Sequence, residues 1–185
     1  MMRKVVVTTM ASLIVLGCSS YLQPAGQGQK VPGSRPVIID SYAPQVIRPG
    51  VAWRIFLQVQ DAGDDLRDIV ENLWQAGMGS YPASVTPVPE EDRSGFVSFL
   101  VLRTPPDNGL LTDRLKLQIV VRDRQGNMSD PVNFPLTFAV NPPSQEVPPK
   151  WQTAKLLGAI WIHIQSTEGS NQEFDGGPGN GWDMR

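Results

Sequence analysis

The clearest alternation of hydrophobic and polar positions lies in residues 114–123, RLKLQIVVRD. A period of two puts hydrophobic side chains on one face of an extended chain, so this stretch is predicted to be a strand with one buried face. Gly126 and Asn127 follow, and both residue types favour turns. The inward-facing residues are Leu115, Leu117, Ile119 and Val121.

Similar patterns recur, separated by turn residues, throughout residues 36–140. Pro44 divides the first predicted strand into two pieces, and Pro135 interrupts the last one; proline in a strand indicates a sheet edge, because it cannot donate a backbone hydrogen bond. About seven short strands at this spacing predict an all-β sandwich of two sheets. The other predicted strands are residues 53–61, 66–75, 83–88, 96–103 and 132–140.

Residues 66–75 fit two structures. Their large hydrophobic side chains have the spacing of an amphipathic helix, with Asp65 as a possible N-cap and Gly77 as a possible end. The position between two strong strands favours a strand instead, because topology often overrides local propensity. Trp53 and Trp74 are expected in the core, where two sheets about 10 Å apart need large side chains.

Residues 1–17 have the composition of a signal peptide. Arg3 and Lys4 precede an apolar run over residues 5–16, which is too short for a permanent membrane span. The run ends in VLGC at Cys18, which resembles the lipobox of bacterial lipoproteins. The resemblance implies that Cys18 is acylated and attaches the protein to a membrane, and Ser19 then suggests the outer membrane. The alternative is an ordinary secretory leader with an incidental cysteine.

The regions outside residues 36–140 are expected to be mostly flexible, because they are rich in polar residues, glycine and proline. We expect a tether at 18–35, a proline-rich linker at 141–155 and a disordered tail at 166–185. Residues 156–165 are predicted to be an extra strand that either docks on the sandwich or pairs with a partner. Deletion of residues 151–185 is therefore expected to leave the fold intact.

The phrases LQVQDAGDDL and LQIVVRDRQGNMSDPVNF resemble bacterial immunoglobulin-like, cadherin-like and PKD-like domains. The resemblance implies an immunoglobulin-like β-sandwich over residues 36–140, in a lipoprotein that carries a single such module. Cys18 is the one cysteine, so the fold has no disulfide of the antibody type.

Acidic turns suggest a possible calcium site, because loops after the second and sixth predicted strands emerge at the same end of such a fold. Ca²⁺ requires six to eight hard oxygen ligands. The alternative is that the same side chains cap turns and accept backbone hydrogen bonds. The candidate ligands are Asp61, Asp64, Asp65, Asp123, Asn127 and Asp130.

The sequence contains no motif that indicates catalysis. His163 is the one histidine, and there is no nucleophile elbow, P-loop or dinucleotide fingerprint. A net charge of −2 without a basic cluster argues against a nucleic-acid partner. We therefore expect a non-enzymatic envelope protein that acts through protein–protein contact, in adhesion or assembly. The alternative is a calcium-dependent or carbohydrate-binding surface module.

The candidate residues for partner binding lie in the predicted extra strand: Ile160, Trp161, Ile162 and Ile164. Tryptophan is enriched at binding hot spots, so Trp151, Trp161 and Trp182 are either recognition anchors or residues that dock on the domain itself.

Overall fold

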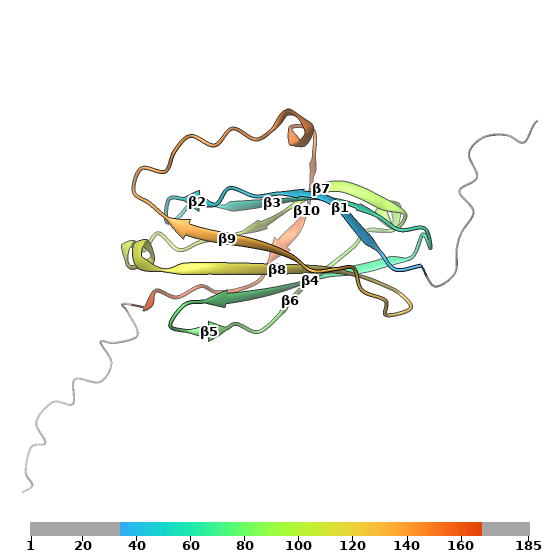
Figure 1. Cartoon of the computed structure of the whole chain (residues 1–185), viewed down its shortest axis with the longest axis horizontal. Helices are drawn as coiled ribbons and strands as arrows, with labels where there is room; N and C mark the ends of the chain where they lie inside the picture. Colours follow the sequence, from blue (N-terminus) through green and yellow to red (C-terminus); the bar gives the residue numbers. More distant parts are fainter. Residues whose placement is uncertain (1–33, 168–185) are drawn as a thin grey trace, which may run out of the picture.

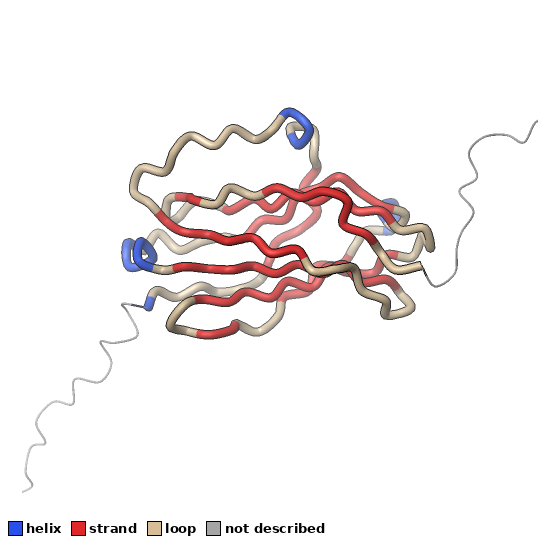
Figure 2. The backbone as a smooth tube through the Cα atoms, in the orientation of Figure 1, coloured by secondary structure: helices blue, strands red, loops and turns tan. Residues whose placement is uncertain are grey.

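A computed structural model describes residues 34–167, which form two β-sheets packed face to face (Figure 1). The predicted leader, the lipidation site Cys18, most of the expected tether and nearly all of the expected tail, with Trp182, lie outside these residues. Within residues 34–167, Figure 2 shows strands in red joined by loops and short 3-10 helices in blue.

One sheet has four strands in the order β1-β3-β7-β10, and the other has six, with the path β2-β9-β8-β4-β5 and β6 paired to β4. The 3-10 helices are η1 (Glu90–Asp92), η2 (Asn108–Thr112) and η3 (Pro149–Trp151). The strands are β1 (Val37–Tyr42), β2 (Val46–Ile47), β3 (Trp53–Gln60), β4 (Leu66–Gln75), β5 (Gly79–Ser80), β6 (Ser84–Pro87), β7 (Gly95–Leu102), β8 (Arg114–Asp123), β9 (Val132–Phe138) and β10 (Lys155–Ile160).

The strand order is that of an immunoglobulin-like sandwich, which confirms the predicted fold class. The two pieces of the first strand join different sheets: β1 pairs antiparallel with β3, and β2 pairs parallel with β9. Pro44 lies between them, where no ladder hydrogen bond is required of its nitrogen. Both pieces are edge strands, as Pro44 predicted.

The strand β10 completes the four-stranded sheet from the C-terminal side of the chain. It pairs parallel with β7, whereas β1, β3 and β7 pair antiparallel with one another. The segment between β6 and β7 contains only η1 and supplies no strand beside β7, so this edge is open to β10. The packed unit therefore extends beyond residue 140, where the sequence suggested that the sandwich ends.

The strand β4 settles the choice between helix and strand at residues 66–75 in favour of a strand. Ile69, Glu71, Leu73 and Gln75 point inward, and a bulge between Leu66 and Asp68 shifts the alternation. Polar residues on the buried face, together with hydrophobic Val70 and Trp74 on the outer face, produce the misleading helical spacing.

The two tryptophans expected in the core lie in different surroundings. Trp53 is fully buried, and its indole N–H donates a 2.7 Å hydrogen bond to the carbonyl of Pro44. Trp74 is 43% exposed on the outer face of β4, so the expectation of a core position was wrong for this residue. The outward direction follows from the register of β4, in which the neighbouring Leu73 and Gln75 occupy the inner face.

The predicted linker at 141–155 covers the outer face of the four-stranded sheet. Trp151 is buried, and its ring lies 5.8 Å from that of Phe56, which in turn lies 5.4 Å from the ring of Phe99. In Figure 1 the segment with η3 passes over this sheet before it enters β10. Trp151 is thus one of the tryptophans that dock on the domain itself.

Candidate functional site

The loops after β3 and β8 meet at one end of the sandwich, as the sequence predicted. Leu66 pairs with Asp123 in the ladder, and the N–H of Arg124 donates a 2.9 Å hydrogen bond to the carbonyl of Asp65. Gln125 adds a 3.2 Å hydrogen bond from its amide to the Asp65 carboxylate. The acidic residues of the two loops are therefore neighbours in space.

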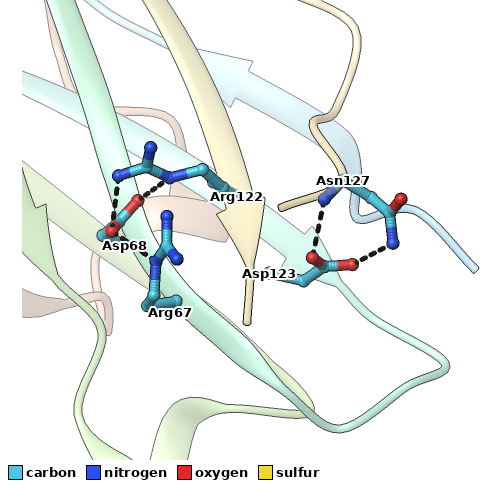
Figure 3. A network of polar contacts seen from close by, with 5 residues as sticks. All are labelled: Arg67, Asp68, Arg122, Asp123 and Asn127. Atoms are coloured by element: carbon cyan, nitrogen blue, oxygen red, sulfur yellow. Dashed lines mark hydrogen bonds and ion pairs between the residues drawn. The ribbon is translucent and has the colours of Figure 1, made fainter. Parts of the chain in front are cut away.

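The six candidate calcium ligands nevertheless do not converge on one point. Asp123 is buried and accepts hydrogen bonds of 2.8 and 2.7 Å from the backbone and side chain of Asn127, which closes the turn (Figure 3). Asp130 forms an exposed ion pair of 2.5 Å with Arg35. Across residues 34–167, no group of three or more His, Cys, Asp or Glu side chains is placed to hold a metal ion.

Asp61 and Asp65 are the two candidate ligands with a buried oxygen that lacks a hydrogen-bond partner. Asp61 Oδ2 accepts a 3.0 Å hydrogen bond from the N–H of Asp65, while Oδ1 of both residues is buried without a partner. Burial raises the pKa of Asp61; backbone hydrogen bonds from Asp65 and Gly63 lower it, and the nearby Asp65 carboxylate raises it further. Asp64, at the tip of the turn, adopts a left-handed φ of 54°.

Sequence reasoning missed an ion-pair cluster on the outer face of β4 and β8. Asp68 accepts two 2.8 Å hydrogen bonds from Arg122 and one of 2.9 Å from Arg67 (Figure 3). Burial alone would raise the pKa of Asp68, but the hydrogen bonds and charges of Arg122 and Arg67 hold it below its ordinary value. The opposite charges of Asp68 and Arg122 could have indicated the ion pair. Recognising that these two residues are opposite each other, however, requires the bulged register of β4 and β8, which the sequence does not show.

The segment after β10 runs along the sandwich with its isoleucines inside. Ile160, Ile162 and Ile164 belong to the hydrophobic core, so their assignment as partner-binding residues was wrong. Their side chains pack in the hydrophobic core between the sheets, which leaves little of their surface open to another molecule. Trp161, between two of them, is 84% exposed.

A buried hydrogen-bond network fixes the end of this segment. The amide of Gln75 donates hydrogen bonds of 3.0 Å to Asp113 and 2.7 Å to the carbonyl of Gln165, and its oxygen accepts one from the Tyr81 hydroxyl. Asp113 also accepts a 2.7 Å hydrogen bond from the hydroxyl of Thr167. Residues 165–167 are thus tied to the sandwich, although residues 166 and 167 were expected in a disordered tail.

Two hollows flank the exposed indole of Trp161. One of about 330 Å³ is lined by Arg103, His163 and residues 159–162, and a smaller one of about 190 Å³ lies toward β6 and includes Val85 and Thr86. The backbone N–H of Trp161 donates a 3.1 Å hydrogen bond to the Ser84 hydroxyl. The indole therefore projects from a fixed backbone between two depressions of the surface.

Glu71 is a fully buried carboxyl on the inner face of β4. Burial raises its pKa to about 7, and the hydroxyls of Thr86 and Ser84 offset only part of that effect. Neither oxygen of the Glu71 carboxyl has a hydrogen bond of acceptable geometry, and the same is true of the Thr86 hydroxyl. Ionisation of Glu71 would therefore place an unpaired charge beneath β6 and β10.

A groove of about 470 Å³ runs along the free edge of β9, between Ser41 to Val46 on one side and Val132 to Pro135 on the other. The short strand β2 covers only Thr137 and Phe138 of that edge. Within the described fold the rest of that edge of β9 is free, but Pro135 has no backbone N–H to donate there. The free edge of β9 is therefore a poor template for an added strand.

No protein-family model and no curated protein matches the chain. Among solved structures, it is similar to the CARDB domain of a Pyrococcus furiosus protein, crystallised in complex with di-metal ions. The match has 12% sequence identity and a TM-score of 0.32, and it covers 58% of this chain and 93% of the other. Residues 34–167 contain no helix long and apolar enough to span a bilayer.

Proposed function

We propose that the protein is a lipid-anchored, non-enzymatic module of a bacterial envelope that binds a protein partner through Trp161. The supporting observation is the contrast along residues 160–164: an indole that is 84% exposed lies between isoleucines that are buried in the core. Binding through this indole requires no further ordering of the backbone, because the N–H of Trp161 is already held by Ser84.

The surroundings of Trp161 support a protein contact. Exposed tryptophan and arginine are the residue types most enriched at binding hot spots, and Arg103 lines the hollow beside the indole. Hollows on both sides of Trp161 offer space for side chains of the partner. The geometry therefore favours a small contact centred on one aromatic residue over an added β-strand at β10.

Attachment to the membrane is part of the proposal and rests on the sequence of the leader. Acyl chains on Cys18 would hold the protein at a membrane, with about 0.8 kcal/mol for each buried CH₂ group. Ser19 places the protein in the outer membrane under the sorting rule common among bacterial lipoproteins. Labelling with a radioactive fatty acid tests this part: Cys18→Ser should lose the label and release the protein from membranes without detergent.

Crosslinking in intact cells tests the contact. A photoreactive residue at position 162 or 164 would lie in the core, so the probe belongs at position 163, which is exposed beside Trp161. The proposal expects a crosslinked protein that Trp161→Ala abolishes. The matched control is Trp74→Ala, an exposed tryptophan on the other sheet, which should leave the crosslink unchanged. An identical crosslink in the Trp161→Ala variant would refute the contact.

A calcium-binding role is a second candidate, supported by the two unpartnered oxygens of Asp61 and Asp65. Calcium should then raise the melting temperature by an amount set by its concentration relative to Kd. Asp61→Asn should remove that increase, whereas Asp130→Asn, at the exposed ion pair, should not. Absence of any increase at millimolar calcium would exclude this role.

A further inference from the structure

The outer face of β4, β8 and β9 carries a row of three amide side chains. Asn72 lies opposite Gln118 in the ladder, and Gln118 lies opposite Asn133. Neighbouring strands are about 4.8 Å apart, so the row spans about 10 Å, comparable with a disaccharide. Gln118 donates a 3.4 Å hydrogen bond to Asn133, while Asn72 makes no side-chain hydrogen bond within residues 34–167.

The adjacent row presents an aromatic ring and a positive charge. Trp74 lies opposite Lys116, which lies opposite Pro135, and all three side chains are exposed. The ammonium of Lys116 lies 5.9 Å from the centre of the Trp74 ring. Arg114 follows on the same face of β8, and neither Arg114 nor Lys116 has a carboxylate partner within the described part of the chain.

The charge of this face is opposite to that of the whole chain, which is −2. The acidic residues of β4, β8 and β9 are Asp68, Glu71 and Asp123. Glu71 and Asp123 are buried, and Asp68 is neutralised by Arg122 and Arg67. Lys116 and Arg114 therefore remain as unpaired cations beside Trp74 and the amide row.

We propose that this face binds an acidic polysaccharide. Each amide both donates and accepts hydrogen bonds, which matches sugar hydroxyls that do the same. The exposed indole offers an apolar surface for the face of a sugar ring, and Lys116 and Arg114 complement its carboxylates. The site is separate from Trp161 and does not depend on the proposed protein contact.

The composition of the face favours a glycan over nucleic acid. Nucleic-acid binding usually depends on about six or more phosphate contacts with Lys and Arg, whereas this face has two unpaired cations. Amide side chains make up a large part of the face, and they add directional hydrogen bonds that a purely electrostatic site for a polyanion does not need.

The test is titration of the full-length chain in detergent with oligogalacturonate, followed by calorimetry and tryptophan fluorescence. Its methyl ester has the same rings without the charge, so it is the matched ligand. We expect binding of the acid, and weaker binding of the ester by about tenfold or more. Trp74→Ala should weaken binding by about tenfold, equivalent to about 1.4 kcal/mol, because the apolar surface for a sugar ring is lost.

Three further variants locate the site and guard against misfolding. Lys116→Gln should remove most of the preference for the acid over the ester, and Asn72→Ala should weaken binding of both ligands. Trp161→Ala is the matched control and should bind as the parent does. The proposal is overturned by absence of binding at millimolar ligand, by equal affinity for acid and ester, by equal affinity for single-stranded DNA, or by an equal loss in Trp161→Ala.

Discussion

The hydroxyl of Ser84 on β6 accepts a 3.1 Å hydrogen bond from the backbone N–H of Trp161, just beyond β10. This bond links the two sheets at their edges, because β6 belongs to the six-stranded sheet and β10 is an edge strand of the four-stranded one. The C-terminal segment is thus part of the sandwich, and the stability of the domain should depend on it.

Truncation should show this dependence directly. A chain that ends at residue 154 loses β10 and three core isoleucines, so its melting temperature should fall by more than about 10 °C. A chain that ends at residue 167 keeps every described contact and should melt within about 2 °C of the full-length protein. Circular dichroism measures both, and equal melting of the shorter chain and the full-length protein would contradict the assignment of β10.

Single substitutions in residues 155–164 should have different effects on stability at buried and at exposed positions. Ile164→Ala removes a buried side chain and should lower the free energy of unfolding by about 2–4 kcal/mol. Leu156→Ala, at a position that is 61% exposed, should cost less than about 0.5 kcal/mol. Urea titration distinguishes them, and similar costs for both variants would show that residues 160–164 are not in the core.

The Gln75 network should hold residues 165–167 in place. Gln75→Ala leaves the Asp113 carboxylate, the Tyr81 hydroxyl and the Gln165 carbonyl without this partner, so we expect a loss of about 2–3 kcal/mol. Hydrogen exchange should rise first in residues 160–167. Unchanged exchange there, together with a global loss of stability, would mean that Gln75 stabilises the sandwich without fastening the segment.

Glu71 should make stability fall as the pH rises. Its folded pKa of about 7 lies above the ordinary value of 4.5, so the folded state retains a proton that the unfolded state loses in this range. The free energy of unfolding should therefore decrease by about 3 kcal/mol between pH 4.5 and 7 because of this group alone. Glu71→Gln should remove that slope and be the more stable protein at pH 8, as measured by denaturant titration across pH. Identical pH profiles for the two proteins would contradict this assignment.

Gly158 permits the close approach of β10 to β6. A Cβ atom at this position would lie 2.6 Å from Cγ2 of Thr86, so Gly158→Ala should destabilise the protein by about 1–3 kcal/mol. Thr86→Ser removes that methyl group and should restore most of the loss in the double variant. Simple additivity of the two substitutions in a double-mutant cycle would show that the two residues are not in contact.

Alternation of hydrophobic positions was sufficient to predict the two-sheet fold and most strands. It was ambiguous at residues 66–75 because Glu71 and Gln75 occupy the buried face of β4 and Trp74 the exposed face. Burial of these two polar residues depends on partners distant in sequence, such as Asp113 for Gln75. Local periodicity contains no information about such partners.

The candidate sites were predictable only in part. An immunoglobulin-like topology predicts that the loops around Asp65 and Asp123 meet. The hydrogen bond that the Asp123 carboxylate accepts from Asn127 depends instead on the conformation of the local turn. The alternation of Ile160 and Ile162 with Trp161 indicated a strand with two different faces. Which of the two faces is buried depends on the free edge of β7, to which β10 adds. No local sequence pattern shows that this edge is free.

Because β10 is the last strand of the described fold, it also affects when the domain can fold. Its partner β7 leaves the ribosome more than fifty residues earlier, yet the edge of β7 stays open until β10 has been synthesised. Pairing over such a separation is slow to form, because a long loop must close first. The domain can therefore complete its four-stranded sheet only after residues 155–160 have been synthesised.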